Sequence, residues 1–352
     1  MFVFIFEFNV KLKACAVKPV KSYYFVYLLI SKFKDNQKSN TYYYRVFGLP
    51  IESEIELRAL HSDNDDEDTA STTILESNEK PILVTIGSAS EPFSREILHD
   101  GGWYRFNHQE FCYEMPNVVR FLVRNGNQII IEPLCDDWDQ ILLFFYSNAI
   151  AAVMFQRGLT PFHVSGVLDS SGRVWLFSAA SKVGKSTTAI MLKERGYQLF
   201  TDDTALFKVI KGKAKAVASY PMVRIWSQTL KKQQVFDVKQ AYQMREDIDK
   251  YGILFHDVFE QNPVEIAGIV FLNNQTYEME IEELTPLKAF SQLRQNVYRN
   301  NWVSKMGLEA GIYQLITNIL SQVPAYVAYR PKNKISFDEF AEMIDDQIIQ
   351  NN

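Results

Sequence analysis

The stretch Ala179–Ser186, which reads AASKVGKS, constrains this chain more than any other feature. It fits the pattern of a phosphate-binding loop: alanine or glycine, four residues of any type, then Gly-Lys and serine or threonine. The apolar run Val174–Ser178 before it predicts a buried strand, and Lys185–Gly196 after it predicts a helix. This order predicts an α/β layer with a phosphate site at the helix N-terminus. A chance match at a strand-to-helix turn is the alternative.

Each part of the motif has a task at a nucleotide. Small residues let backbone N–H groups curl around phosphate oxygens, and the helix dipole favours their negative charge. Lys185 can reach the β- and γ-phosphates, and Ser186 can ligate Mg²⁺. We therefore predict ATP and Mg²⁺ as cofactors, although the motif does not distinguish ATP from other nucleotides. The candidate nucleotide-binding residues are Ala179, Ser181, Lys182, Val183, Gly184, Lys185, Ser186 and Thr187.

Two adjacent carboxylates, Asp202 and Asp203, follow the next expected strand, Tyr197–Thr201. In an open α/β sheet the carboxyl ends of the strands form the ligand-binding edge, so we expect the pair beside the phosphate loop. One carboxylate can hold the metal while the other takes the proton from an attacking hydroxyl. The alternative is an exposed turn in which Asp203 caps backbone groups.

The order of the expected elements divides the chain into three parts. These are an N-terminal appendage over residues 1–40, a small mixed β region over 41–135, and the phosphate-loop domain over 136–352. The β region contains a hairpin signal at Asn125-Gly126, and the apolar stretch after it predicts a helix that ends at Gly158. Beyond the aspartates we expect a hairpin over 204–219, a core strand over 265–274 and a mostly helical segment over 286–323.

The stretch Phe162–Asp203 resembles the kinase domain of the HPr serine kinase/phosphorylase family. The likeness lies in a histidine on the strand before the loop, the Gly-Lys-Ser motif, an Arg-Gly helix end and the paired aspartates. The wider superfamily includes phosphoenolpyruvate carboxykinases. A looser likeness runs from Tyr44 to Tyr329, in the manner of HPr-kinase-like proteins found beside peptide-modifying systems. The resemblance implies an α/β fold with a phosphate-loop domain of this type behind a small β-rich N-terminal region.

The resemblance also implies a role for each matching residue. Lys185 matches the phosphate lysine and Ser186 the Mg²⁺ ligand. Asp202 matches the carboxylate that acts as base, and Asp203 its metal-side neighbour. His163 matches the nearby histidine, although by its strand pattern alone it could equally be a buried histidine with its hydrogen bonds satisfied.

Three positions depart from the family pattern. Ala179 replaces the usual first glycine, Lys182 stands where glycine is common, and Thr187 stands where HPr kinases have an acidic residue. The last departure argues against HPr as the acceptor and against the reverse phosphorylase reaction. Two cations that follow the Asp pair, Arg224 and Lys250, are candidates to neutralise charge on the transferred phosphoryl group. The alternative for both is simple coverage of the surface.

Composition argues against several other functions. The formal charge of -5 and the lack of a basic run argue against a nucleic-acid partner. Cys15, Cys112 and Cys135 are too widely spaced for a disulfide framework or a zinc site. The acidic stretch 61–72 lacks the glycine and glutamate of an EF-hand loop, so we expect a solvated loop. The N-terminus matches neither a membrane span nor a signal peptide, and we expect a cytoplasmic protein.

We therefore expect an ATP-dependent kinase that transfers the γ-phosphoryl group to a hydroxyl, with a serine of a peptide or protein as the favoured acceptor. The candidate catalytic residues are Asp202, Lys185, His163 and Arg224, and the candidate metal ligands are Ser186 and Asp203. Two alternatives remain: a nucleotide-binding regulator or scaffold that hydrolyses little, and a small-molecule kinase or carboxykinase-like enzyme. No membrane partner is expected, and a homo-oligomer stays open.

Overall fold

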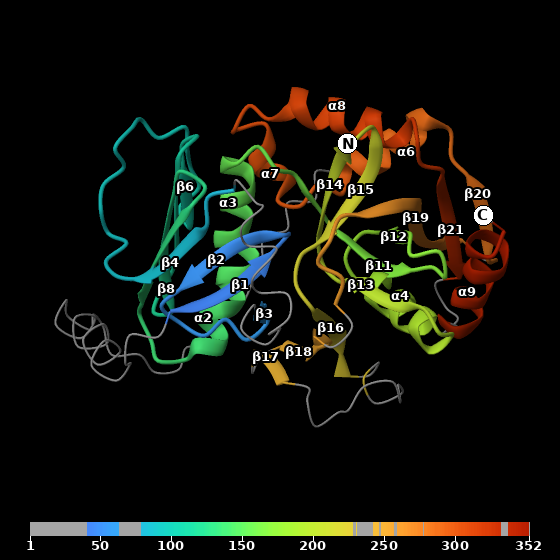
Figure 1. The fold of residues 1–352 in the computed structure, drawn as a ribbon, viewed down its shortest axis with the longest axis horizontal. Helices are drawn as coiled ribbons and strands as arrows, with labels where there is room; N and C mark the ends of the chain where they lie inside the picture. Colours follow the sequence, from blue (N-terminus) through green and yellow to red (C-terminus); the bar gives the residue numbers. More distant parts are fainter. Residues whose placement is uncertain are drawn as a thin grey trace.

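The computed structural model describes residues 41–62, 79–227, 230, 242–245, 248–256, 259–276, 278–331 and 337–351 of the 352-residue chain. The predicted appendage and all but the first two residues of the acidic stretch lie outside the described residues. The described part contains two large sheets, a small third sheet and the helices that pack between and around them (Figure 1). The protein is thus a mixed, sheet-rich α/β protein.

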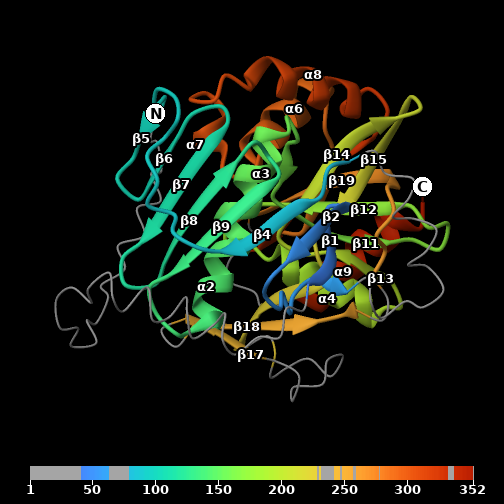
Figure 2. The same cartoon turned by 60° about the vertical axis from the view of Figure 1, so that its left-hand side comes forward.

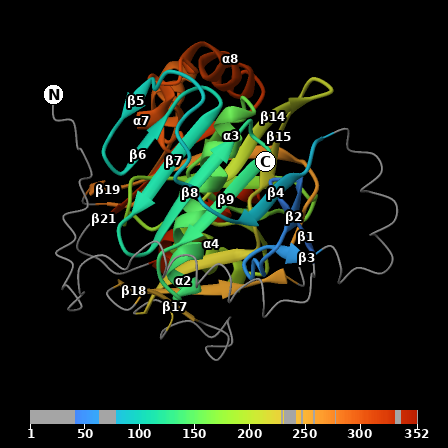
Figure 3. The ribbon, with the colours of Figure 1, turned by 90° about the vertical axis from the view of Figure 1, so that its left-hand side faces the viewer.

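The first sheet lies at one end of the molecule and faces the viewer in Figure 3. In spatial order its strands are β3 (His61–Ser62), β1 (Tyr42–Val46), β2 (Leu49–Ser53), β4 (Ile82–Ile86), β9 (Gln128–Pro133), β8 (Val119–Arg124), β7 (Glu110–Met115), β6 (Tyr104–Phe106) and β5 (His99–Asp100). Strand β4 pairs in parallel with β2 and β9, and the other pairs are antiparallel. The predicted hairpin is confirmed, with Asn125 and Gly126 at φ 53° and 65° between β8 and β9.

A helical segment packs across one face of this sheet and lies between it and the second sheet (Figures 1 and 2). It consists of α2 (Trp138–Phe144), the π-helical turn η1 (Phe145–Ala149) and α3 (Ile150–Gln156). Asp137 caps its start by accepting the N–H of Gln140 at 3.0 Å, and Gly158 at φ 69° follows its end, as predicted. Its length and composition would suffice to cross a membrane, but 67% of its most apolar window is buried inside the molecule.

The second sheet carries the segment Ala179–Ser186, which was predicted to be a phosphate loop and is called by that name below. Its main path runs through β10 (Pro161–Phe162), β14 (Ala205–Ile210), β15 (Lys213–Ala218), β19 (Val264–Thr276), β12 (Val174–Ser178), β11 (Val164–Leu168) and β13 (Gln198–Thr201), and β19 also pairs with β21 (Ala325–Pro331), which pairs with β20 (Glu280–Glu283). Strand β11 lies antiparallel between β12 and β13. Because β11 opposes both neighbours, β12 and β13 run in the same direction and their carboxyl ends meet at one edge. The Asp pair after β13 therefore lies at the same edge as the loop after β12, as expected. The sequence did not predict that β11 would lie between these two strands.

Helices cover both faces of the second sheet (Figure 1). On one side lie α4 (Lys185–Glu194), α9 (Phe337–Ile344) and the π-helical turn η4 (Asp345–Ile349), and on the other lie α6 (Pro286–Gln295), α7 (Asn300–Val303) and α8 (Glu309–Leu320). The predicted helical character of residues 286–323 is confirmed. The predicted hairpin over 204–219 is also confirmed, as β14 and β15. A third sheet follows it, with β16 (Met222–Trp226), β18 (Ile248–Leu254) and β17 (Tyr242–Arg245) in that spatial order.

Alternate residues of β12 point into two different hydrophobic cores. Val174 and Leu176 join a large core that also contains the N-terminal sheet and α2–α3, whereas Trp175 and Phe177 join a smaller core under α4 and α9. The large core runs unbroken across residue 135, where a domain boundary was predicted, and that boundary remains a prediction. One continuous core therefore holds the N-terminal sheet against the sheet that carries the phosphate loop.

Candidate active site

The loop between β12 and α4 turns through two residues with positive φ. Lys182 has φ 69° and Gly184 has φ 125°. Glycine is required at 184 for a second reason, because a Cβ there would lie 2.5 Å from Cε1 of Phe337 on α9. Lys182 has a Cβ in the left-handed region, which costs its backbone roughly 1–2 kcal/mol. This conformation accounts for the glycine that is common at this position.

The first turn of α4 presents backbone N–H groups to this loop. Thr188 N–H donates to the carbonyl of Gly184 at 2.8 Å, which begins the helical ladder, and no side chain of the described residues caps the helix start. The N–H groups before Thr188 have no acceptor within a helix. Together with the helix dipole they favour an anion at the loop.

The predicted nucleotide-binding residues divide into a buried and an exposed group. Ala179 is buried in the smaller core and Val183 packs against that core, so both side chains anchor the loop to the core. Ser181 and Lys182 are exposed, and the Lys182 ammonium lies 5.9 Å from the ring centroid of Trp226 on β16. Thr187 is half-buried on the first turn of α4. The loop thus presents its backbone and its two central side chains to solvent.

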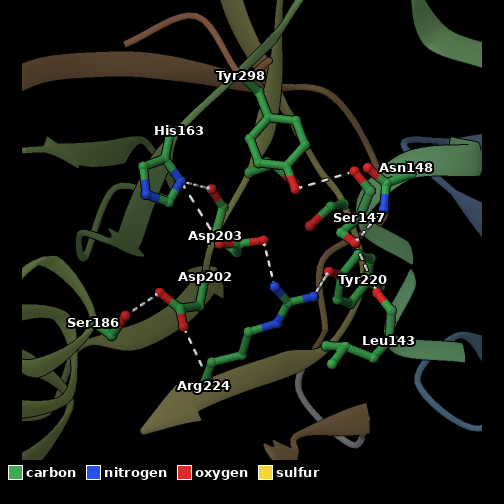
Figure 4. A network of polar contacts seen from close by, with 12 residues as sticks. Leu143, Ser147, Asn148, His163, Ser186, Asp202, Asp203, Tyr220, Arg224 and Tyr298 are labelled. Carbon is green, nitrogen blue, oxygen red and sulfur yellow. Dashed lines mark hydrogen bonds and ion pairs between the residues drawn. The ribbon is translucent and has the colours of Figure 1, made fainter. Parts of the chain in front are cut away.

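Asp202 lies directly beside the phosphate loop. Its Oδ1 accepts a hydrogen bond from the Ser186 hydroxyl at 2.7 Å (Figure 4). The same oxygen accepts from the Ser165 hydroxyl at 2.5 Å. Its Oδ2 accepts the backbone N–H of Arg224 at 2.8 Å. The carboxylate is 2% exposed, and both of its oxygens accept hydrogen bonds. The structure therefore brings Ser186 and Asp202 together as one unit at the start of α4.

Asp203 is held in a different way from its neighbour. Its backbone is left-handed, at φ 75°, and its Oδ2 accepts a hydrogen bond from the Arg224 guanidinium at 2.8 Å. The same guanidinium donates to the Tyr220 hydroxyl at 2.5 Å. Burial lowers the pKa of Arg224, but the negative charge of Asp203 and the nearby Tyr220 outweigh it and raise the pKa overall. Arg224 therefore stays charged and contacts both carboxylates, Asp202 through its backbone and Asp203 through its side chain.

His163 bridges Asp203 and the phosphate-loop lysine. Its Nδ1 lies 2.7 Å from the carbonyl oxygen of Asp203, and its Nε2 lies 2.9 Å from Nζ of Lys185. A carbonyl can only accept, so Nδ1 carries the proton and Nε2 accepts from the Lys185 ammonium. Removal from water, followed by the charge of Lys185, lowers the pKa of His163 to about 4. The histidine is therefore neutral at pH 7 and orients the buried lysine.

The polar groups of the site continue towards the helix behind the N-terminal sheet. The ring of Tyr298 lies 6.1 Å from that of His163, and its hydroxyl donates to the carbonyl of Ser147 in η1 at 3.3 Å (Figure 4). Arg299 donates to the same carbonyl at 3.1 and 3.2 Å. The N–H of His163 donates to the carbonyl of Asn296 at 2.8 Å. The segment before α7 thus holds His163 in place through the Asn296 carbonyl and the Tyr298 ring.

Three contributors to the site were not among the predicted residues. Ser165 could have been found, because the sequence pattern places it two residues after His163 on the same expected strand face. In the structure Ser165 lies on β11, whereas His163 lies between β10 and β11 and not on a strand. Tyr220 and Tyr298 carry no sequence signal, since they reach the site only through the packing of β16 and the segment before α7. Of the other predicted cation, Lys250, the structure describes the backbone, which pairs with Trp226 between β18 and β16.

Comparison with known proteins leaves the family of this chain open. No family model matches the chain, and no curated protein matches it. Among solved structures it is similar to the Hpr(Ser) kinase/phosphatase from Coxiella burnetii, with 10% sequence identity and a TM-score of 0.27 over 55% of this chain and 99% of that chain. These values correspond to a distant, fold-level relationship and do not indicate an activity.

Proposed function

We propose that this chain is an ATP-dependent kinase that transfers the γ-phosphoryl group to a hydroxyl, with a serine of a peptide or protein as acceptor. The observation that carries the proposal is the hydrogen bond between Ser186 and Asp202 at the start of α4. A hydroxyl bonded to a buried carboxylate, at a helix start beside a lysine, is the arrangement that phosphate-loop enzymes use for a nucleotide and its metal.

The residues of the site fit ATP with Mg²⁺. The uncapped start of α4 suits phosphate oxygens, and Lys185 is the cation beside it. Mg²⁺ needs few protein ligands, usually one or two carboxylates besides substrate phosphates and water. Among the described residues, no three histidine, cysteine or acidic side chains are placed so that together they could hold a metal ion. Ser186 with Asp202 would therefore hold the ion. When bound, Mg²⁺ would offset the charge that develops on the phosphates.

The contacts favour a division of labour opposite to the one predicted from sequence. Asp202, predicted as the base, is nearly inaccessible, and both of its oxygens accept hydrogen bonds. Asp203, predicted on the metal side, has 14% of its side chain exposed. Its Oδ2 accepts from Arg224, and its Oδ1 lies 3.7 Å from Nδ1 of His163. We therefore assign the metal side to Asp202 and the base to Asp203.

The transfer step follows from these assignments. Backbone N–H groups and Lys185 bind and orient the phosphates, and Arg224 fixes the plane of the Asp203 carboxylate. As the acceptor oxygen bonds to the γ-phosphorus, the bond from phosphorus to the bridging oxygen of the leaving ADP breaks. The hydroxyl proton goes to Oδ1 of Asp203. Arg224 is then a positioning residue for the base.

The surroundings of the site support a peptide or protein acceptor. A small anionic substrate would need cations of its own, but Arg224 donates to Asp203 and Tyr220, and Lys182 lies over Trp226. Thr187, where an acidic residue is usual, argues against HPr itself. A cytoplasmic location, no nucleic-acid or membrane partner, and the oligomeric state remain proposals from the sequence.

Calorimetry with Mg-ATP tests the proposal. Lys185→Ala should weaken binding about 100-fold or more, because a charge-assisted contact to the phosphates is lost. Lys193→Ala, in the last turn of the same helix, is the matched control and should bind as wild type does. Equal affinity of the Lys185 variant and wild type would contradict the proposal. Normal ATP binding without phosphoryl transfer or phosphate release would instead indicate a nucleotide-binding scaffold.

A further inference from the structure

Trp226 is the exposed end of an otherwise buried strand. The four preceding residues of β16 are buried, whereas Trp226 is 40% exposed. Side chains alternate along a strand, so Trp226 lies on the same face as Arg224, while Val223 and Ile225 face the smaller core. A large aromatic ring is thus presented at the surface on the strand face that holds the carboxylates.

The phosphate loop reaches the same ring. The Lys182 ammonium lies 5.9 Å from the ring centroid of Trp226. Along the strand, Trp226 is two residues, or about 6.6 Å, from Arg224, which contacts both Asp202 and Asp203. The ring therefore lies beside Lys182 of the loop, on the strand whose Arg224 contacts both carboxylates.

The position of the ring places it on the acceptor side of the proposed reaction. In a phosphate-loop kinase the γ-phosphate points towards the metal-binding hydroxyl and its carboxylate, and the acceptor approaches there. We propose that Trp226 forms a platform on which an apolar or aromatic side chain of the acceptor peptide stacks beside the acceptor serine. This inference rests on the proposed kinase function, because it requires a peptide acceptor.

The chemistry of the platform determines where its effect appears. An indole offers a wide, flat apolar face on which an apolar or aromatic side chain can stack. The platform touches a flanking side chain of the acceptor and not the transferred group. It therefore contributes to acceptor binding equally in the ground state and the transition state, which changes KM for the peptide and leaves kcat alone.

A synthetic library of peptides with one central serine and randomised flanking positions tests this site. Wild type should select aromatic or aliphatic residues at one flanking position. Trp226→Ala should lose that selection and raise KM for the selected peptide about tenfold, with kcat and Mg-ATP affinity unchanged. Trp226→Phe should keep the selection. Trp103→Ala is the matched control, because Trp103 is 51% exposed beside the N-terminal sheet and should be dispensable.

Each other outcome overturns the inference in a distinguishable way. Transfer by wild type with the same residue selection and KM in Trp226→Ala would show that the ring has no part in acceptor recognition. A fall in Mg-ATP affinity equal to the fall in peptide affinity would assign the ring to the nucleobase. If wild type neither binds Mg-ATP nor phosphorylates the library, the kinase proposal fails, and the platform fails with it.

Discussion

The two large sheets both bury carboxylates, but they use them differently. In the N-terminal sheet Glu110 accepts hydrogen bonds from Ser94 N–H at 2.9 Å and from Asn107 at 3.0 Å, and pairs with Arg124 at 3.3 Å. Every one of these partners belongs to the β-rich region itself. Glu132 is similar, with Ala89 N–H at 2.7 Å. These hydrogen bonds hold the segment that contains Ala89 and Ser94 against strands β9 and β7.

In the second sheet the buried carboxylate of Asp202 bonds to a residue of the loop that we propose to bind an anion. Asp202 accepts from Ser186, in the first turn of a helix whose N-terminus no described side chain caps. The comparison shows that a buried, fully bonded carboxylate does not by itself indicate a catalytic site. For Asp202 the indication comes from its partner Ser186, which lies on the loop that we propose to bind phosphate. A variant of Asp202 should therefore affect nucleotide binding, and a variant of Glu110 should affect only stability.

The largest effect is expected at the Asp pair. Asp203→Asn should reduce phosphoryl transfer by about 10²- to 10⁴-fold, the usual contribution of a general base, while Mg-ATP still binds. Asp202→Asn should instead weaken both Mg²⁺ dependence and nucleotide affinity, because the partner of Ser186 is lost. Transfer assays and calorimetry on both variants measure this difference. The opposite pattern would restore the division of roles predicted from sequence.

Gly184→Ala should have the next largest effect, and it should fall on both stability and binding. The new methyl group would meet Phe337 at 2.5 Å in a backbone at φ 125°, so loop and α9 must separate. We expect a loss of about 1–3 kcal/mol in the free energy of unfolding, together with the loss of Mg-ATP affinity. Gly172→Ala is the control, because its φ is also positive at 76° but nothing lies within 4 Å of the added Cβ. Normal nucleotide affinity in Gly184→Ala would contradict the role of this contact.

Glu110→Gln tests whether the buried carboxylate of the N-terminal sheet serves stability alone. It should lower the free energy of unfolding by about 1–3 kcal/mol, because buried donors lose a charged acceptor, and leave Mg-ATP affinity unchanged. Burial raises the pKa of Glu110, but Asn107, Ser94 and Arg124 outweigh it and lower the pKa overall. Its stabilisation is therefore present above the unfolded pKa of about 4.3 and lost as pH falls through the lower, folded pKa.

Denaturation of wild type and Glu110→Gln across acidic pH checks this sign. The stability difference between them should be full above about pH 4.3 and shrink below it. A difference that grows with acid, or a variant that loses Mg-ATP binding while folded, would remove the distinction between the two sheets.

Lys182→Gly should give the smallest effect. Glycine relieves about 1–2 kcal/mol of left-handed strain, but it frees the unfolded chain and removes the contact with Trp226, so the stability should change by less than about 1 kcal/mol. Mg-ATP affinity should stay near that of wild type. A large fall in affinity would mean that the Lys182 ammonium turns from the ring to the phosphates.

Local features of the sequence were sufficient for much of the fold. The hairpin at Asn125-Gly126, the helix that Gly158 follows and the strand, loop and helix around Ser186 all depend on periodicity and turn chemistry within a few residues. The Asp pair could be expected near the loop because strand direction follows from chain order in an α/β layer.

Other parts of the site depended on contacts between distant segments. Nothing local in the sequence indicates that Phe337 packs on Gly184, or that Tyr298 joins His163 to the helix behind the N-terminal sheet. Arg224 was a candidate to neutralise charge on the phosphoryl group, and only the structure shows that it contacts the two carboxylates and Tyr220. Side chains far apart in the sequence meet only when the sheets and helices pack, and spacing along the chain carries no record of that packing.

The sequence by itself determined which groups this protein has for the proposed phosphate chemistry: a small-residue loop, a lysine and a serine at a helix start, and two carboxylates after the next strand. The tertiary structure decided which of these groups bond to each other: Asp202 accepts a hydrogen bond from Ser186, and Asp203 accepts one from Arg224. The physical reason is that residue type sets the charge and hydrogen-bonding capacity of a group. Its burial and its partners select one role among those it could perform. Here they are set by strand β11, which carries Ser165, and by strand β16, which carries Arg224.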